Sequence, residues 1–219
     1  MPSSGTTCET SPSFSQLSAI ARACRDRGYA YAAVSDHSHG LAIAGGMSAQ
    51  EAADQRRAID DINAEHGSGF RLLQGIEANI GADGRLDLSD DEAERFEIVL
   101  AAPHAKLRSP DNQTPRLLTA VHNPHVRILA HPRGRITGSR GGIVAAWDAV
   151  FAAAADRAVA VELDGDPARQ DLDYTMAAQA LDAGCIFALD RMRTPPISWH
   201  MPRPPSRMPG LRAFRPPAL

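Results

Sequence analysis

Six short apolar runs along this chain each stop at a histidine or an acidic residue. Continuous apolar runs bounded by turn residues are typical of strands that are buried on both faces. Because the carboxyl ends of parallel strands gather functional side chains, this phasing predicts one shared site. In chain order, the run from Tyr29 ends in Asp36 and His37, Arg71–Ile76 in Glu77, Phe96–Ala102 in Pro103 and His104, Val126–Ala130 in His131, Ala158–Val161 in Glu162 and Asp164, and Ile186–Leu189 in Asp190.

Helical patterns separate these runs, which predicts a mostly parallel α/β sheet because each parallel return needs a crossover. Ser48 and Glu51 form a predicted capping box that opens a long helix to about His66. Six strand ends that carry a histidine or an acidic residue favour a TIM-like barrel over an open sheet, because an open sheet binds ligands at one switch point. The chain begins with a helix, so we expect the barrel to lack its first strand. The other expected helices are Ser13–Gly28, Asp90–Arg95, Thr114–Val121, Val144–Asp156 and Asp173–Ala183.

The composition sets broad limits on the kind of protein. A chain of 219 residues that is 43% hydrophobic can bury one substantial core. The net charge of −3 excludes a global basic field, so any contact with nucleic acid must be local. Three cysteines without a C-x-x-C spacing argue against a disulfide framework. No apolar run approaches the roughly 18 residues of a membrane span, and we expect a cytoplasmic protein.

His37, Glu77, His104 and His131 are the ligand types that suit zinc, manganese or iron. They lie far apart in the sequence, so the predicted metal site is formed by tertiary structure. Metal ions held by histidine and carboxylate at a barrel mouth indicate hydrolysis of a phosphate ester by activated water. Two arginines of the AHPRGR segment, Arg133 and Arg135, are predicted to grip the phosphate oxygens.

Several acidic residues near the strand ends have two interpretations. Asp36 either caps the following loop or supports the neighbouring histidine ligand. Glu162 and Asp164 lie in VELDGDP, where a turn and a catalytic role are about equally favoured. A charged helix start accounts for Arg169, Asp171 and Asp173. Five histidines outside the strand ends are expected to be solvated, namely His39, His66, His122, His125 and His200.

The strand-end motifs resemble the PHP (polymerase and histidinol phosphatase) superfamily, in the version related to bacterial X-family DNA polymerases. The matching segments include AVSDHSHGLAIAGG, FRLLQGIEANI, VLAAPHAKLRS, ILAHPRGR and VELDGDPARQDLDYTMAAQALDAGCIFALD, and together they cover about residues 16–190. The resemblance implies a distorted (β/α)7 barrel with two or three divalent metal ions that hydrolyses phosphomonoesters or phosphodiesters. It also implies metal ligation by His37, Glu77, His104 and His131, with Asp36 in support.

Two motifs of the family are missing from this chain. Residues 1–15 hold no His-x-His pair, and Asp190 is followed by Arg-Met-Arg-Thr where the family has Ser-Asp-Ala-His-Thr. Deletion of one base from codons for Asp-Ser-Asp-Ala-His yields Asp-Arg-Met-Arg-Thr, so we interpret the arginine- and proline-rich end as frameshifted. We expect an irregular leader over residues 1–12, a PHP-like domain over 13–190 and a disordered or frameshifted tail over 191–219.

Three functions follow from this reading. The first is a metal-dependent phosphoesterase that acts on a phosphorylated small molecule or on a nucleic-acid 3′ end. The second is a catalytically impaired remnant or binding module of the same fold, since the missing motifs carry ligands. The third is a 3′–5′ exonuclease module related to X-family polymerases.

Overall fold

The computed structural model describes residues 14–40, 46–165 and 169–190. Strands and helices alternate along these residues, as the sequence predicts. The strands are β1 (Tyr31–His37), β2 (Arg71–Asn79), β3 (Ile98–Ala102), β4 (Val126–Leu129), β5 (Ala160–Asp164) and β6 (Phe187–Asp190). The helices are α1 (Phe14–Asp26), α2 (Ala49–His66), the 3-10 turn η2 (Gly67–Gly69), α3 (Asp90–Ala93), α4 (Thr114–His122), α5 (Trp147–Asp156) and α6 (Tyr174–Asp182).

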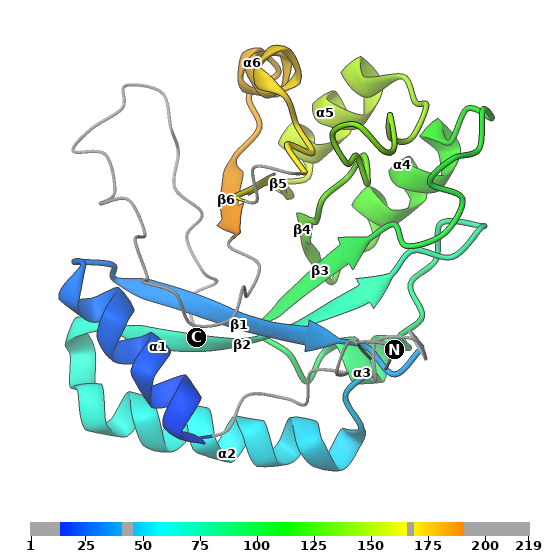
Figure 1. The fold of residues 1–219 in the computed structure, drawn as a ribbon. Coiled ribbons are helices and arrows are strands. Elements are labelled where there is room, and N and C mark those ends of the chain that lie inside the picture. Colours follow the sequence, from blue (N-terminus) through cyan, green and yellow to red (C-terminus); the bar gives the residue numbers. More distant parts are fainter. Residues whose placement is uncertain (1–13, 41–45, 166–168, 191–219) are drawn as a thin grey trace, which may run out of the picture.

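All six strands pair in parallel in one sheet, and their order in the sheet is their order in the chain. A doubly wound sheet would reverse direction partway along, and this sheet does not. It curls instead, so that β3 to β6 rise away from β1 and β2 as a half-barrel (Figure 1). The prediction of a parallel α/β sheet with barrel-like curvature is therefore confirmed.

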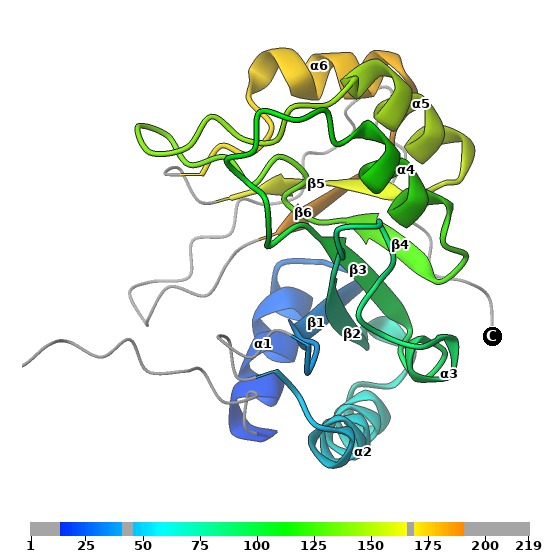
Figure 2. The same ribbon diagram turned by 90° about the vertical axis from the view of Figure 1, so that its right-hand side faces the viewer.

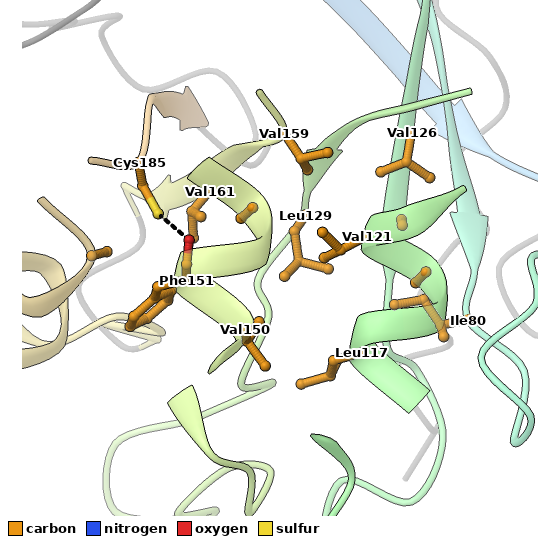
Figure 3. Packing of buried hydrophobic residues seen from close by; sticks show 14 of the residues in the cluster. Ile80, Leu117, Val121, Val126, Leu129, Val150, Phe151, Val159, Val161 and Cys185 are labelled. Carbon is orange, nitrogen blue, oxygen red and sulfur yellow. Dashed lines mark hydrogen bonds between the residues drawn. The ribbon is translucent and has the colours of Figure 1, made fainter. Parts of the chain in front are cut away.

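The helices cover the convex face of the sheet (Figures 1 and 2). Leu17 of α1 and Ile59 of α2 pack against Leu72 of β2, and all three are fully buried. A second cluster joins α4, α5 and α6 to the outer side of β3, β4 and β5, and includes the fully buried Phe151 and Leu129 (Figure 3). Burial of these side chains is the main source of stability for the fold.

The strand residues that alternate with those of the two outer clusters face the inside of the curl, because successive side chains of a strand point to opposite faces. Leu73, Ile98, Leu100, Ile128 and Ala160 form one apolar cluster there. Toward the carboxyl ends of the strands, the inward-facing positions are occupied by polar side chains. The apolar cluster therefore forms the floor of the predicted site.

Two helices illustrate where local sequence rules succeed and fail. The capping box at Ser48 and Glu51 is present, and α2 ends at His66 as predicted. Helix α5 begins at Trp147 rather than at Val144. Val144 accepts a hydrogen bond from the Gln113 backbone N–H at 2.8 Å, and the Ala146 N–H donates to Thr114 Oγ1 at 2.7 Å. These contacts to the start of α4 hold residues 144–146 outside the helix.

Some predictions fall outside the described part of the chain. The leader over residues 1–12 and the tail over 191–219 lie there, so both stay predictions, as does the domain boundary at 13–190. No strand precedes β1 within the described ranges. None of the helices described is long and apolar enough to cross a membrane.

Candidate metal centre

The carboxyl ends of four neighbouring strands carry the predicted ligands. His37 is the last residue of β1 and lies opposite Glu77 of β2 in the sheet register. His104 and His131 follow β3 and β4 by two residues each. Since the four strands run parallel and side by side, all four side chains reach the same edge of the half-barrel.

Three imidazoles surround one oxygen of Glu77. The distances from Glu77 Oε1 to the Nε2 atoms are 3.0 Å for His104, 3.5 Å for His37 and 3.7 Å for His131. The ring centroids of His37 and His104 lie 5.6 Å apart, and those of His104 and His131 lie 5.4 Å apart. In His37, Glu77 and His104, one ligand atom of each residue lies within 4.8 Å of the other two.

The polar atoms of this cluster fit a cation. Glu77 Oε1 is buried, yet it accepts no hydrogen bond from the described residues. An unsatisfied buried carboxylate oxygen is costly, and a metal ion between it and the imidazole nitrogens would remove the cost. Nitrogen and oxygen donors of this kind suit zinc, manganese or iron. The His37 side chain is 39% exposed, so the cluster is open to solvent on the β1 side.

The electrostatics of the cluster follow from burial and from close opposite charges. Burial alone would raise the pKa of Glu77, but the close contact with the His104 ring, followed by the charges of His131 and His37, lowers it overall. Burial likewise opposes a proton on His131, yet Glu162 and Glu77 raise the pKa of that ring above its ordinary value. The cluster therefore attracts positive charge, whether protons or a metal ion.

Glu162 is a further member of the site, and it comes from the inner face of β5. The residue is only 2% exposed. Its carboxylate lies 3.3 Å from His131 Nδ1 and accepts a hydrogen bond from the His131 backbone N–H. A carboxylate on Nδ1 fixes the ring so that Nε2 points to a metal ion. Of the two roles open for Glu162, the structure supports a role in the site. The signal in the sequence is its place at the end of a strand, next to Asp164 on the same face.

Asp36 does not face this cluster. It precedes His37 in β1 and so points to the opposite face of the sheet, where its Oδ2 accepts a hydrogen bond from Gln55 of α2 at 2.6 Å. Gln55 in turn accepts a hydrogen bond from Gln74 at 3.0 Å. The hydrogen bond between Gln55 and Asp36 thus belongs to a buried polar network between the sheet and α2.

Arg133 and Arg135 lie on the turn that follows His131, and both contact Asp173. The Arg133 guanidinium is 3.0 Å from Asp173 Oδ2, and that of Arg135 is 3.7 Å from the same atom. Their backbone N–H groups donate to the buried Asp171 at 2.9 and 2.8 Å. This double clamp holds the turn after β4 against the loop after β5. The two arginines are therefore already engaged by carboxylates.

Asp87 links the ends of β1 and β2 beside the cluster. Its carboxylate accepts hydrogen bonds from Ser38 Oγ at 2.7 Å and from the Asn79 backbone N–H at 2.9 Å. Any side chain at Gly40 would overlap this carboxylate. Asn79 Oδ1 in turn accepts the His104 backbone N–H at 3.4 Å. Nothing local in the sequence singles out Asp87, because its partner Ser38 lies 49 residues away along the chain.

The remaining described histidines do not join the site. His39 lies 4.0 Å from Glu92, and His125 lies 3.3 Å from Asp90. The His66 ring contacts Arg25, and the His122 ring contacts the Leu118 carbonyl. The fifth, His200, lies outside the described residues.

Comparisons with known proteins identify relatives of this chain, although no family model matches it. It is 39% identical over 186 residues to the DNA polymerase/3'-5' exonuclease PolX of Bacillus subtilis, which covers 80% of the chain and 32% of PolX. It is 36% identical over 69 residues to a probable phosphatase of Caldanaerobacter subterraneus, and 32% identical over 100 residues to one of Shewanella halifaxensis. The chain spans about a third of the length of these relatives. It is a PHP-domain relative of the X-family DNA polymerases.

Proposed function

We propose that this chain is a metal-dependent phosphoesterase of the PHP type. The observation that carries the proposal is the convergence of three imidazole nitrogens on the buried, unsatisfied Glu77 Oε1. His37, Glu77, His104 and His131 would hold one or more divalent ions, with zinc, manganese or iron favoured by the donor atoms. Such ions supply charge that stabilises the transition state of phosphate ester hydrolysis and lower the pKa of water.

The residues of the chain have separate tasks in this proposal. Glu77 supplies the negative charge, and the three histidines supply neutral nitrogen donors. Glu162 contacts Nδ1 of His131 and so orients the ring with Nε2 toward the proposed ion. A phosphate grip by Arg133 or Arg135 would compete with Asp173, so we assign the two arginines first to the shape of the loop. Asp36 would act only indirectly, through the position of β1.

We also propose the finer features of the fold and setting. The half-barrel corresponds to a (β/α)7 barrel without its first strand, formed by residues 13–190 of a cytoplasmic protein. The substrate would be a phosphate ester, either of a small molecule or at the 3′ end of a nucleic acid. The Bacillus subtilis relative is named as a 3'-5' exonuclease, which favours the nucleic acid as the second candidate substrate.

Hydrolysis of an aryl phosphate by the purified chain tests the proposal. The protein is freed of metal with a chelator and then reloaded with Mn²⁺ or Zn²⁺. We expect metal-dependent turnover that falls at least about 100-fold in Glu77→Gln, because a ligand carboxylate is lost. His125→Gln is the matched control, since it removes a histidine whose partner is Asp90. Absence of turnover in every metal would contradict the proposal and favour a catalytically impaired remnant.

A further inference from the structure

The carboxylate of Asp87 joins the ends of two strands that carry predicted ligands. Its Oδ2 accepts a hydrogen bond from Ser38 Oγ at 2.7 Å, and Ser38 directly follows His37. Its Oδ1 accepts the Asn79 backbone N–H at 2.9 Å, and Asn79 lies two residues after Glu77. The Asp87 N–H also donates to the Asn79 carbonyl at 3.1 Å, which holds these two residues together. Each oxygen of one side chain is thus bound to the end of a different strand.

Asn79 extends this link to a third strand. Its side-chain Oδ1 accepts the backbone N–H of His104 at 3.4 Å. The paired residues of β2 and β3 end at Asn79 and Ala102, so His104 lies two residues beyond the last pair. At that point a side chain, rather than a neighbouring strand, contacts the His104 backbone. We name Ser38, Asp87 and Asn79 the Asp87 brace.

The brace reaches every member of the tight ligand group. One ligand atom of each of His37, Glu77 and His104 lies within 4.8 Å of the other two. Among the described residues, no group of this kind includes Asp87. The two oxygens of Asp87 are bound to the strand ends instead. This arrangement indicates that the residue places the ligands and is not a ligand itself.

Close packing leaves the Asp87 carboxylate little room to move. Ser38 is only 1% exposed, and its N–H donates to the Glu77 carbonyl at 2.9 Å, which fixes the hydroxyl donor. Gly40 lies so near that a Cβ at this position would overlap Oδ2 of Asp87. Metal ligands need such support, because a site works only when its side chains are held within about 0.5 Å of the productive geometry.

We propose that Asp87 is a positioning residue of the metal centre. Through the other two members of the brace it sets the spacing of His37, Glu77 and His104. The inference rests on the proposed function, because this spacing matters only if the three residues bind a metal ion. A role of Asp87 in folding alone would leave the arrangement of ligands around a bound ion unchanged.

The test is titration of the metal-free chain with Co²⁺, followed by its visible absorption spectrum. Co²⁺ binds to the nitrogen and oxygen donors that also bind zinc, and its spectrum depends on the number and arrangement of the ligands. We expect Asp87→Ala to weaken Co²⁺ binding by about 10- to 100-fold and to alter the spectrum, because the ligands lose their spacing. Asp87→Asn should keep both, since its amide oxygen can accept the Asn79 N–H while its amide nitrogen donates to Ser38 Oγ.

Gly40→Ala tests the brace without a change to Asp87. The added methyl group displaces the carboxylate, so this variant should weaken Co²⁺ binding and alter the spectrum as Asp87→Ala does. Asp83→Ala is the matched control, because it removes a carboxylate of the same loop that accepts the Arg85 backbone N–H at 3.0 Å. Its Co²⁺ affinity and spectrum should equal those of the unaltered chain. Urea unfolding of each metal-free variant verifies that it folds, and if Asp87→Ala does not, Asp87→Asn and Gly40→Ala decide.

Two results would overturn the inference while the proposed function stands. One is binding of Co²⁺ by Asp87→Ala and Gly40→Ala with the affinity and spectrum of the unaltered chain. The other is an equal loss in Asp87→Asn and Asp87→Ala, which would assign the effect to the negative charge of Asp87 and not to the position of the ligands. An unaltered chain that binds no Co²⁺ would contradict the proposed function, and the inference with it.

Discussion

At the residue scale, Glu77 and His131 determine the charge balance of the candidate metal centre. Both are largely buried, and each stabilises the charged form of the other across 3.7 Å. A buried charge is tolerated when an opposite charge compensates its loss of hydration. Without metal, the raised pKa of His131 favours a proton on that ring, which supplies part of the compensation. The metal-free protein should therefore respond to pH through these two residues.

We predict that the metal-free protein is most stable at mildly acidic pH, near pH 5 to 6. The pKa of Glu77 is lowered in the folded state, so its contribution is present above the ordinary value of 4.5 and is lost as the pH falls below it. The pKa of His131 is raised, so its contribution is present below the ordinary value of 6.5 and is lost as the pH rises. Urea unfolding in a chelator between pH 4 and 9 measures this dependence.

His131→Gln separates this effect from other titrations. The variant should lose the decline in stability above pH 6.5, whereas His122→Gln, which removes a ring bonded to a carbonyl of its own helix, should keep it. A decline of the same size in His131→Gln would contradict the charge balance described above. Added Zn²⁺ should reverse the decline, because a metal ion replaces the protons and binds better as they leave.

At the scale of elements, a single buried arginine joins the loops that carry the site. Arg116 of α4 is 5% exposed, and its guanidinium donates to four acceptors. They are the carbonyls of Ile80, Gly81 and Ala105 and the side chain of Gln113. Ile80 and Gly81 follow β2, and Ala105 follows His104. Arg116 therefore sets how the loop after β2 meets the loop after β3.

We expect Arg116→Met to lower the free energy of unfolding by about 2 to 4 kcal/mol, because buried carbonyl groups lose their donors. Urea unfolding measures the change. Arg127→Met is the control, since Arg127 donates to the Pro124 carbonyl at the exposed amino end of β4 and should change stability by less than about 0.5 kcal/mol. Equal effects in the two variants would contradict the role given to Arg116.

Sequence rules predict elements well where the signal is local. The apolar runs predict all six described strands, and the capping box at Ser48 predicts the start of α2. The face of a strand is also a local signal. Asp36 and His37 are adjacent in β1, so alternation predicts that their side chains point to opposite faces of the sheet. The hydrogen bond from Gln55 to Asp36 agrees with this, and a supporting role for Asp36 stays a prediction. The engagement of Arg133 and Arg135 by Asp173 could not be predicted, because the partners are about 40 residues apart.

At the scale of the whole molecule, the order of the strands explains why distant residues form one centre. Each strand pairs with the next in the chain, so the predicted ligands at the ends of β1, β2, β3 and β4 form a row along one edge. The sheet curls (Figure 1), and three imidazole rings lie around Glu77. The sequence predicts this row, because the carboxyl ends of parallel strands lie at one common edge, and here they carry histidines and acidic residues. Closure into a seven-stranded barrel stays a prediction, since residues 1–13 and 191–219 lie outside the described ranges.

The most direct test of the account is the amount of metal that the chain binds. After equilibrium dialysis against Zn²⁺ or Mn²⁺, elemental analysis should give at least one equivalent per chain, and Glu77→Gln and His104→Ala should each abolish most of it while His125→Gln leaves it unchanged. If the unaltered chain binds no metal, or if both ligand variants bind as much as it does, then His37, Glu77, His104 and His131 are not a metal centre.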